Sequence, residues 1–500
     1  MKFTKNLSRL PLLLILIISG LILSINLNKP FIGHHDFNSV FYGNMAKNYL
    51  RFGFLKTKLG QVTSILQENP LKFGYHTHHP PLLPILMGIS FLSFSSFEAA
   101  GRAVPIAFSL IGVLIFHQLV AKFFSKQIAF FSSLFFILTP MFIYFGKLPV
   151  HEPLVLGFSI SLIYFYFLWV KNRNNKYFFY MIPIFIFAEL TGWPSYYLPV
   201  IFFIHSLFFV KESKIIKKTF ILIVLSVFVF SFLLLHNVIL TRNLFGGGLL
   251  KAFLFRFNIG QRASTYPFTL LEFFRKEALW GSIFFTKTLI LLSLFYLINT
   301  FLKILKSKKT SITQSIIFVL FFFGIIHPLI FRNAAFLHDY MLFYLLPPLA
   351  LSGALGLQLI ITQVTKVLGL KKIKTLSLIT FILVTTLIAT EKLKFVDALL
   401  NSNMHLDGYI LGKIIKKDIN PQENILVVSK KFKDYEDIFV NFYSENQKIS
   451  YTENLNPDNV KNFNWLIFLK NSPEINQADL KNLSKYSTVE KQNFFFIKIE

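Results

Sequence analysis

The sequence contains no cysteine, and only 15% of its 500 residues are charged. The absence of cysteine excludes disulfides, thiolate metal sites and cysteine nucleophiles. Soluble proteins carry about 25% charged residues, so this composition also excludes an ordinary soluble enzyme. Instead, 54% of the residues are apolar, and 63 phenylalanines gather with leucine and isoleucine in long blocks. Such blocks are typical of a polytopic membrane protein.

Apolar runs predict about eleven membrane-spanning helices, since a span needs about 20 residues. The first run, 10–27, follows a basic N-terminus, and no small-residue cleavage site comes after it, so we expect a retained helix and not a signal peptide. The other ten spans are expected near 103–121, 127–145, 154–170, 177–191, 196–210, 219–240, 280–302, 312–331, 340–361 and 375–390. The shorter apolar run 82–94 is expected to form a helix on the membrane surface.

Basic residues fix the sidedness of these spans. The net charge is +27, and the basic short loops all fall on one side of an eleven-span protein; they are 122–126, 171–176, 211–218, 303–309 and 366–374. The positive-inside rule makes that side cytoplasmic, so we expect a multi-pass plasma (inner) membrane protein with a cytoplasmic N-terminus. The basic excess is therefore a topology signal. It indicates contact with membrane lipids and no nucleic-acid partner.

The chain is expected to have two parts. Residues 1–391 form a membrane module with outer loops 28–101, 241–279 and 327–339, and residues 392–500 are far more polar. Within this tail, the apolar runs 425–428, 465–468 and 494–497 predict buried strands separated by helices. The predicted fold class is an all-α polytopic membrane protein with a small C-terminal α/β domain outside the membrane.

The first outer loop carries candidate functional groups at both ends. Asp36 lies just beyond the first helix, where a carboxylate can accept a proton from a hydroxyl or hold a divalent ion. The alternative role of Asp36 is to cap a helix over 37–50. His78 and His79 end a cluster of three histidines that could bind a phosphate or a metal, or could simply form a pH-sensitive loop.

Further candidates lie in the other outer loops. Glu152 and Lys147 share a short loop between apolar helices, as functional groups or as a structural ion pair. Arg256 and Arg262 belong to a cationic loop that suits phosphate binding, or a helix lying on anionic headgroups. His338 and Tyr340 stand at the outer end of a span. They could orient a substrate, although an interfacial aromatic anchor is the alternative for Tyr340.

Taken in chain order, these residues resemble a known family. The features are a short first helix followed by Asp36, then His79-Pro80-Pro81-Leu82, Gly101-Arg102-Ala103-Val104-Pro105, Pro140 with Tyr144 to Lys147, Glu152, and Asp339-Tyr340 ahead of Leu346-Pro347. Over roughly residues 5–360, their order is similar to that of the GT-C glycosyltransferases of the protein O-mannosyltransferase and aminoarabinose-transferase type, which are family-39-like integral membrane enzymes.

The resemblance implies transfer of a sugar, with inversion, from a polyprenyl-phosphate donor to a hydroxyl on a lipid, glycan or protein at the outer face. By the match, Asp36 falls at the position of the base, Glu152 at the second acid, and Lys147 near the donor phosphate. His79-Pro80-Pro81 falls at the lip that contacts the carrier. Phe37 departs from the pattern, because protein mannosyltransferases usually have a second acid there, and this leaves the acceptor class open.

Elementary chemistry agrees with this interpretation. A leaving lipid phosphate needs cations, and an inverting displacement needs one base and no paired acid. This chemistry requires no cofactor, and whether it uses a divalent metal ion is left open. The alternative function is a flippase or transporter of lipid-linked sugars, which needs a polar path that Glu189, His205 and His236 would line. A third candidate function is that of a membrane scaffold whose C-terminal tail binds a partner.

Overall fold

The computed structural model describes residues 10–499 except 64–71, 95–96, 244–247, 258–266, 308–310, 370–372, 446–447, 456–459 and 471–485. The chain forms two compact units. The helical unit consists of Met1–Leu27, His76–Leu83 and Arg102–Leu400. The α/β unit consists of Asn28–Tyr75, Pro84–Gly101 and Asn401–Glu500.

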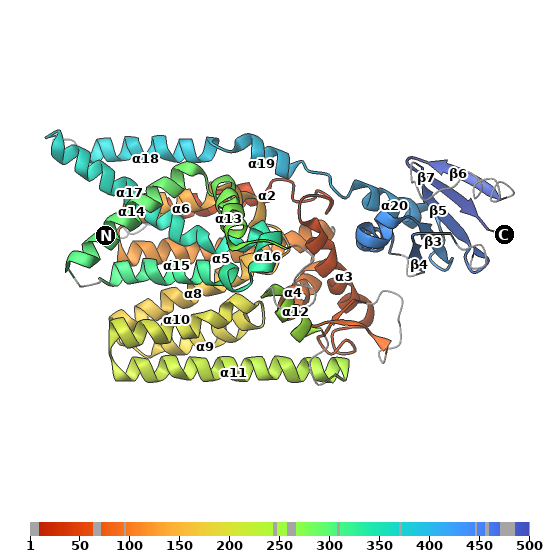
Figure 1. Cartoon of the computed structure of the whole chain (residues 1–500), viewed down its shortest axis with the longest axis horizontal. Helices are drawn as coiled ribbons and strands as arrows, with labels where there is room; N and C mark the ends of the chain where they lie inside the picture. Colours follow the sequence, from red (N-terminus) through yellow and green to blue (C-terminus); the bar gives the residue numbers. More distant parts are fainter. Residues whose placement is uncertain are drawn as a thin grey trace. The chain divides into compact units, whose positions relative to one another are not determined.

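Leucine-, isoleucine- and phenylalanine-rich segments form the helices of the helical unit (Figure 1). They are α2 (Leu10–Ser24), α5 (Phe97–Phe123), α6 (Lys126–Ile137), α7 (Pro140–Phe145), α8 (His151–Asn172), α9 (Lys176–Glu189), η2 (Trp193–Tyr196), α10 (Tyr197–His205), η3 (Ser206–Val210), α11 (Ser213–Thr241), α12 (Leu249–Arg256), α13 (Leu270–Phe284), α14 (Lys287–Ser307), α15 (Ile312–Ile330), α16 (Arg332–Leu337), η5 (Asp339–Leu345), α17 (Leu346–Val367), α18 (Ile373–Thr390) and α19 (Leu393–Leu400). Side-chain caps open several of them; Thr269 and Ser311, for example, begin capping boxes at α13 and α15.

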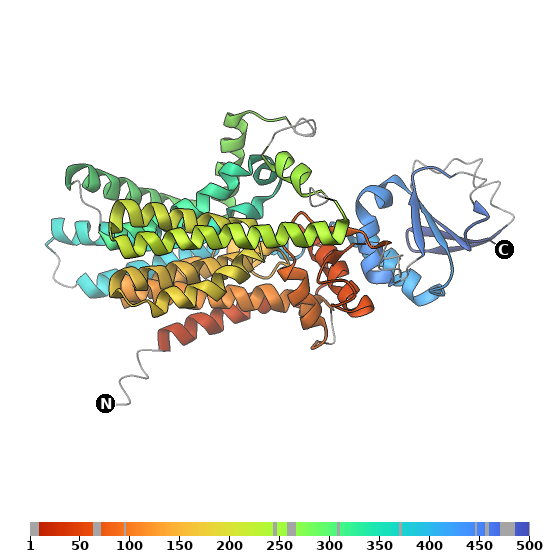
Figure 2. The same ribbon diagram turned by 90° about the horizontal axis from the view of Figure 1, so that it is seen from below.

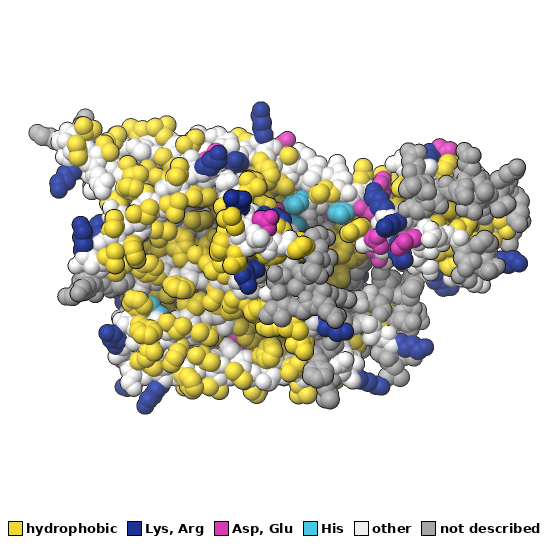
Figure 3. All heavy atoms as spheres, viewed as in Figure 1, with side chains coloured by type: hydrophobic (Ala, Val, Ile, Leu, Met, Phe, Trp, Pro, Cys, Tyr) yellow, Lys and Arg dark blue, Asp and Glu magenta, His cyan; other side chains and the backbone are white. Residues whose placement is uncertain are grey.

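The predicted polytopic helical architecture is confirmed. Among the described residues, seven helices are long and apolar enough to cross a membrane, or eight if the pair Thr375–Thr390 and Leu393–Leu400, bent by 42°, counts as one span. A helix also lies at each remaining predicted span, although α2, α6 and α9 are shorter. Figure 3 shows hydrophobic side chains spread over the surface of the helical unit, as expected for a face in contact with lipid.

Two predicted spans are broken in the structure. The run 127–145 divides into α6 and α7, because Pro140 has no backbone N–H to continue α6 and begins a new helix capped by Thr139. The run 280–302 contains the end of α13 and most of α14. Thr286, between them, adopts a left-handed backbone conformation with φ 67°, which ends the first helix.

Close helix packing builds the core of the helical unit. Helices α9, α10 and α11 lie side by side (Figures 1 and 2), and α17 packs against both α6 and α14. Gly356 of α17 sits against the Leu292 carbonyl of α14, where a Cβ would overlap the carbonyl oxygen. Ser293 and Ser352 form a 2.6 Å hydrogen bond across the same helix pair. Small and hydroxyl-bearing residues at such interfaces are typical of membrane helices.

The α/β unit contains a five-stranded sheet in the order β4-β3-β5-β7-β6. Its strands are β3 (Ile425–Val428), β4 (Ile449–Thr452), β5 (Trp465–Leu469), β6 (Ser487–Lys491) and β7 (Phe494–Lys498). β4, β3 and β5 are parallel, and β7 and β6 are antiparallel additions. Helix α20 (Leu406–Asp418) packs on the sheet through Leu411 and Ile415. The predicted strands are confirmed, and β4 and β6 are additional.

The α/β unit also includes much of the first predicted outer loop. Its remaining elements are α3 (Asp36–Phe52), β1 (Gln61–Val62), η6 (Phe432–Glu436), α21 (Asp437–Ser444) and most of α4 (Leu82–Phe91), while β2 (Tyr75–His76) ends in the helical unit, to which His76–Leu83 belong. Helix α3 packs against α21 in a cluster built from Phe31, Val40, Phe439, Phe442 and Tyr443. The Phe31 N–H donates to the Tyr443 hydroxyl at 2.7 Å. The loop and the tail therefore fold together. The boundary predicted at 391/392 stays a prediction, while α19 belongs to the helical unit.

Candidate active site

A cluster of imidazole rings lies in the segment that enters α4. The rings of His76 and His78 are 4.8 Å apart, and those of His76 and His79 are 6.0 Å apart. His79 also stacks on His151, the first residue of α8, with centroids 4.6 Å apart. The indole N–H of Trp193 donates to the His78 carbonyl at 2.9 Å. Residues from three parts of the sequence therefore fix this histidine cluster.

Arg256 brings a cation to the histidine cluster. It is the last residue of α12, and its Nη2 lies 2.8 Å from His79 Nε2. Helix α12 is held in place by the Asn333 amide, which donates to the Phe255 carbonyl at 2.9 Å. Phe257, just after α12, packs on Phe331 with rings 5.1 Å apart. The predicted candidates His78, His79 and Arg256 are thus gathered in one place.

Two pockets of different character share Arg256. The first, of about 320 Å³, is almost wholly apolar apart from Arg256, with Trp193, Phe230, Phe253 and Phe331 among its lining residues. The second, of about 370 Å³, is more polar and is lined by His78, Lys251 and Arg256 among others. Arg256 therefore lines both an apolar cavity and a cationic cavity.

The electrostatics of the cluster follow from burial and from Arg256. Burial, and secondarily the charge of Arg256, lowers the pKa of His78 and holds the pKa of His79 well below its ordinary value. The same two causes, with the neighbouring histidines, hold the pKa of His76 well below its ordinary value. Near neutral pH these rings are uncharged and Arg256 carries the positive charge. Neutral imidazoles can still donate one N–H each to an anionic oxygen.

Glu152 and Lys147 lie near the start of α8 but have different neighbours. Glu152 is buried in the first turn of α8, where the helix dipole favours a negative charge. It interacts electrostatically with Tyr344 of η5, whose buried hydroxyl has no hydrogen-bond partner among the described residues. Lys147 Nζ donates to the Ile25 carbonyl. Whether Glu152 and Lys147 act as functional groups or as a structural ion pair stays a prediction.

A second polar group forms between α13 and η5. The rings of His338 and Tyr340 stack with centroids 5.0 Å apart, and Asp339 between them is buried. Burial, opposed by Lys276 and reinforced by Asp339, raises the pKa of Glu277 to about 8. The cations of this loop were predicted from the sequence, but Glu277 was not. The signal for it was a carboxylate next to Lys276 on a helix that also carries Glu272 and Arg275.

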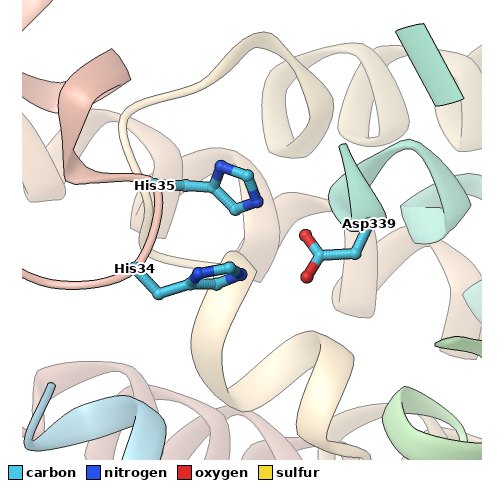
Figure 4. A group of neighbouring side chains, drawn as sticks. All are labelled: His34, His35 and Asp339. Atoms are coloured by element: carbon cyan, nitrogen blue, oxygen red, sulfur yellow. The ribbon is translucent and has the colours of Figure 1, made fainter. Parts of the chain in front are cut away.

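Asp36 belongs to the α/β unit, where it begins α3. One carboxylate oxygen accepts the Gly33 N–H at 2.7 Å, and the other accepts the Ser39 hydroxyl at 2.8 Å. The rings of His34 and His35 lie side by side just before it, with centroids 4.0 Å apart (Figure 4). The N-cap of α3 is His35, and the Asp36 carboxylate braces the turn that enters the helix without accepting a backbone N–H of its first turn, so the structure does not show the capping alternative. A carboxylate with one hydrogen bond to each oxygen keeps lone pairs for a substrate proton.

The other candidates are placed as follows. Arg262 lies outside the described residues. Within each unit taken alone, no three His, Asp or Glu ligand atoms of the described residues lie close enough to one another to hold a metal ion.

The transporter alternative would need a polar path through the helices. Glu189 accepts a hydrogen bond from Ser226 at 2.5 Å, and His205 forms a hydrogen bond with Tyr166 at 2.8 Å. These two groups have separate partners on different helices, which does not favour a continuous polar path.

Known proteins resemble this chain in sequence and in fold. Residues 78–236 match the family model of dolichyl-phosphate-mannose-protein mannosyltransferases. The crystal structure of ArnT from Cupriavidus metallidurans bound to undecaprenyl phosphate is similar with a TM-score of 0.62 and 12% identity, over 97% of each chain. The Archaeoglobus fulgidus oligosaccharyltransferase tethered with an acceptor peptide is similar with a TM-score of 0.55 and 14% identity, over 88% of this chain and 63% of that one. No protein with a curated description matches the sequence.

Proposed function

The chain has the GT-C glycosyltransferase fold that its motifs predict, and on this premise we propose that it transfers a sugar from a polyprenyl-phosphate donor to an acceptor hydroxyl at the outer face of the plasma membrane. The acceptor is a lipid, a glycan or a protein. A bound undecaprenyl phosphate in the similar ArnT structure supports a carrier of this kind.

The position of Arg256 carries the proposal. A polyprenyl phosphate has an anionic head and an apolar tail, and Arg256 borders both a cationic pocket and an apolar one. Arginine binds phosphate oxygens through two parallel N–H groups. Burial of isoprene units among Trp193, Phe230 and Phe253 lowers the free energy of the bound state. One side chain thus marks the boundary that this amphipathic ligand requires.

The chemistry is a single displacement at the anomeric carbon. The acceptor oxygen attacks this carbon, the bond from it to the phosphate oxygen breaks, and polyprenyl phosphate leaves with the electron pair. Arg256, Lys251 and the N–H groups of His78 and His79 stabilise the developing negative charge. Asp36 is the proposed base that takes the hydroxyl proton, and Glu152, with Tyr344, orients the sugar. Attack opposite the leaving group inverts the anomeric configuration.

The proposed orientation places the basic loops in the cytoplasm. Lys171 and Arg173 lie at the C-terminal end of α8, and Lys211 and Lys214 lie where η3 ends and α11 begins. The positive-inside rule then puts the histidine cluster and the C-terminal α/β domain on the outer side. Lipid-linked donors and cell-envelope acceptors are available on that side.

Release of free polyprenyl phosphate tests the proposal without knowledge of the acceptor. The full-length protein in proteoliposomes would receive a panel of undecaprenyl-phosphate hexoses and pentoses with an envelope extract as acceptor. We expect release from at least one donor, and a loss of about 100–1,000-fold in Arg256→Ala, the size seen when a charge-stabilising donor is removed. Arg242→Ala, in the same loop, is the matched control. Release that is equal in both variants, or absent from every donor, contradicts the proposal.

A further inference from the structure

The α/β unit contains a pocket of about 310 Å³ that the proposed transfer does not use. Helix α3 provides Phe37, Phe41 and Asn44 on one side, and η6 and α21 provide Asp434, Asp437 and Asn441 on the other. This volume is at the lower end of the range of about 300–1,000 Å³ found for small-molecule sites.

Both walls of the pocket are firmly held. The Asn44 amide donates to the Ile438 carbonyl at 3.1 Å. Lys47 Nζ donates to the Phe442 carbonyl at 2.6 Å and lies 3.8 Å from the centre of the Phe442 ring. Gly43 allows this close approach, because a Cβ there would lie 2.7 Å from the same ring. The pocket is therefore formed in advance of any ligand.

The α3 wall is an aromatic platform. Phe37 and Phe41 are one helical turn apart, and their rings are nearly parallel, 14° between planes and 6.0 Å between centroids. Phe37 remains 41% exposed, although α3 has a well-packed core face nearby. Flat aromatic faces of this kind attract the C–H groups of a sugar ring through dispersion and their negative quadrupole.

The opposite wall consists of polar groups with fixed orientations. The Tyr451 hydroxyl donates to Asn441 Oδ1 at 2.9 Å, so the amide N–H₂ of Asn441 is the end left to donate. Asn44 uses its own N–H₂ on Ile438, so its oxygen is the end left to accept. Burial raises the pKa of Asp437 to about 6, with the adjacent Glu436 adding to the shift. Near pH 7 the Asp437 carboxylate is ionised, and this ionisation lowers the stability of the folded state. Perturbed groups of this kind are common at ligand sites.

From these two walls we infer that the pocket binds one ring of a hydroxyl-rich saccharide, which under the proposed function is part of the acceptor. Donors, acceptors and an aromatic face are what the hydroxyl and C–H groups of a sugar require. Asp434 and Asp437 outnumber Lys433 around the pocket, so a phosphate or a carboxylate ligand is repelled. The many polar groups likewise disfavour an acyl chain. Uncharged and amino sugars fit.

Saturation-transfer NMR on the full-length protein in nanodiscs tests this inference. The probes are the methyl glycosides of glucose, mannose, N-acetylglucosamine and glucosamine, with a Ser/Thr-rich peptide as the competing class. We expect at least one glycoside to bind, and Phe37→Ala and Asp437→Asn to weaken it at least tenfold. Tyr435→Ala, which removes a 64% exposed ring of η6 outside the pocket, is the matched control and should bind like the unmodified protein.

The outcomes separate this inference from the proposed function, since no donor is present in the binding experiment. If no glycoside binds, if only the peptide binds, or if Phe37→Ala and Tyr435→Ala behave alike, the saccharide site is contradicted even where polyprenyl phosphate is released. If glycosides bind as expected but no donor yields polyprenyl phosphate, the saccharide site stands and the glycosyltransferase proposal fails.

Discussion

The two units place polar and apolar residues in opposite ways. On α11 of the helical unit, Thr219 and Ser226 are buried, while Val227 and Phe228 are 60% and 68% exposed. In the α/β unit, all four residues of β3 are buried apolar side chains. Apolar exposure is normal where lipid is the solvent, and apolar burial is normal in water.

This difference changes which observation points to function. In the helical unit, a gathering of inward polar groups is informative, because such groups are costly in a membrane protein. Arg256 with the histidine cluster is such a gathering. In the α/β unit, the informative observations are an exposed aromatic pair and a carboxylate that is ionised at a cost, and Phe37, Phe41 and Asp437 supply them.

The largest effect is expected from Asp36→Asn, which should lower transfer by about 1,000-fold or more because an amide cannot accept the proton. Ser39→Ala is the matched control, since it removes one hydrogen bond to Asp36 and leaves the carboxylate intact. Transfer and thermal unfolding should be measured for both variants. If both variants lose transfer and stability to the same degree, Asp36 only supports the start of α3.

Gly412→Ala should break the α/β unit selectively. A Cβ on α20 at this position would lie 2.7 Å from the Tyr443 Cβ and 3.0 Å from the Val440 carbonyl oxygen of α21. Overpacking of this kind costs about 1–3 kcal/mol. The fluorescence of Trp465, in β5, should report a lower unfolding midpoint. Gly20→Ala, on α2, is the control, because its Cβ would meet no atom within 4 Å; an equal loss in both variants contradicts the packing account.

Trp193→Phe should sharpen the account of the helical unit. The change removes the hydrogen bond to the His78 carbonyl but keeps an aromatic ring at the apolar pocket. One hydrogen bond contributes about 1 kcal/mol, so the KM for the donor should rise roughly fivefold. Trp465→Phe makes the same chemical change in the α/β unit and should leave the KM unaltered. A KM that is the same in both variants would dissociate Trp193 from donor binding.

The smallest expected effect is a gain in thermal stability, in the variant Asp437→Asn. Because the pKa of Asp437 in the folded protein is raised to about 6 from an ordinary 3.8, the folded state binds more protons than the unfolded state between these values. The stability that this group contributes is therefore lost as the pH rises through 6. Asp437→Asn should raise the unfolding temperature by a few degrees at pH 7 and by almost nothing at pH 4. A destabilised variant at pH 7 would show that the carboxylate serves folding and not a ligand.

The sequence predicted the elements whose residues share one environment. The apolar spans and the strands β3, β5 and β7 were foreseen because they are continuous apolar runs. β6 was missed because this edge strand reads Ser-Thr-Val-Glu-Lys and lies largely exposed. The packing of α3 on α21 was also missed, since contacts such as that of Phe31 with Tyr443 join residues 412 positions apart.

For the site, the sequence predicted which kinds of residue take part but not which individual residues come together. Arg242, Lys251 and Arg256 look equivalent along the chain. Only the end of α12, held by Asn333, brings Arg256 and not Arg242 to His79. Trp193 was not predicted at the site, because nothing local indicates that its indole reaches the His78 carbonyl.

Binding of undecaprenyl phosphate, without any sugar, tests the central claim most directly. Titration of the full-length protein in nanodiscs, followed by the fluorescence of Trp193 in a variant whose other three tryptophans are replaced by phenylalanine, should show saturable binding. Arg256→Ala should weaken it by about 10–100-fold, the loss of one charged hydrogen-bonding group, and Arg242→Ala should not. Binding of equal strength in both variants, or no saturable binding, would contradict the account of a lipid-phosphate site at Arg256.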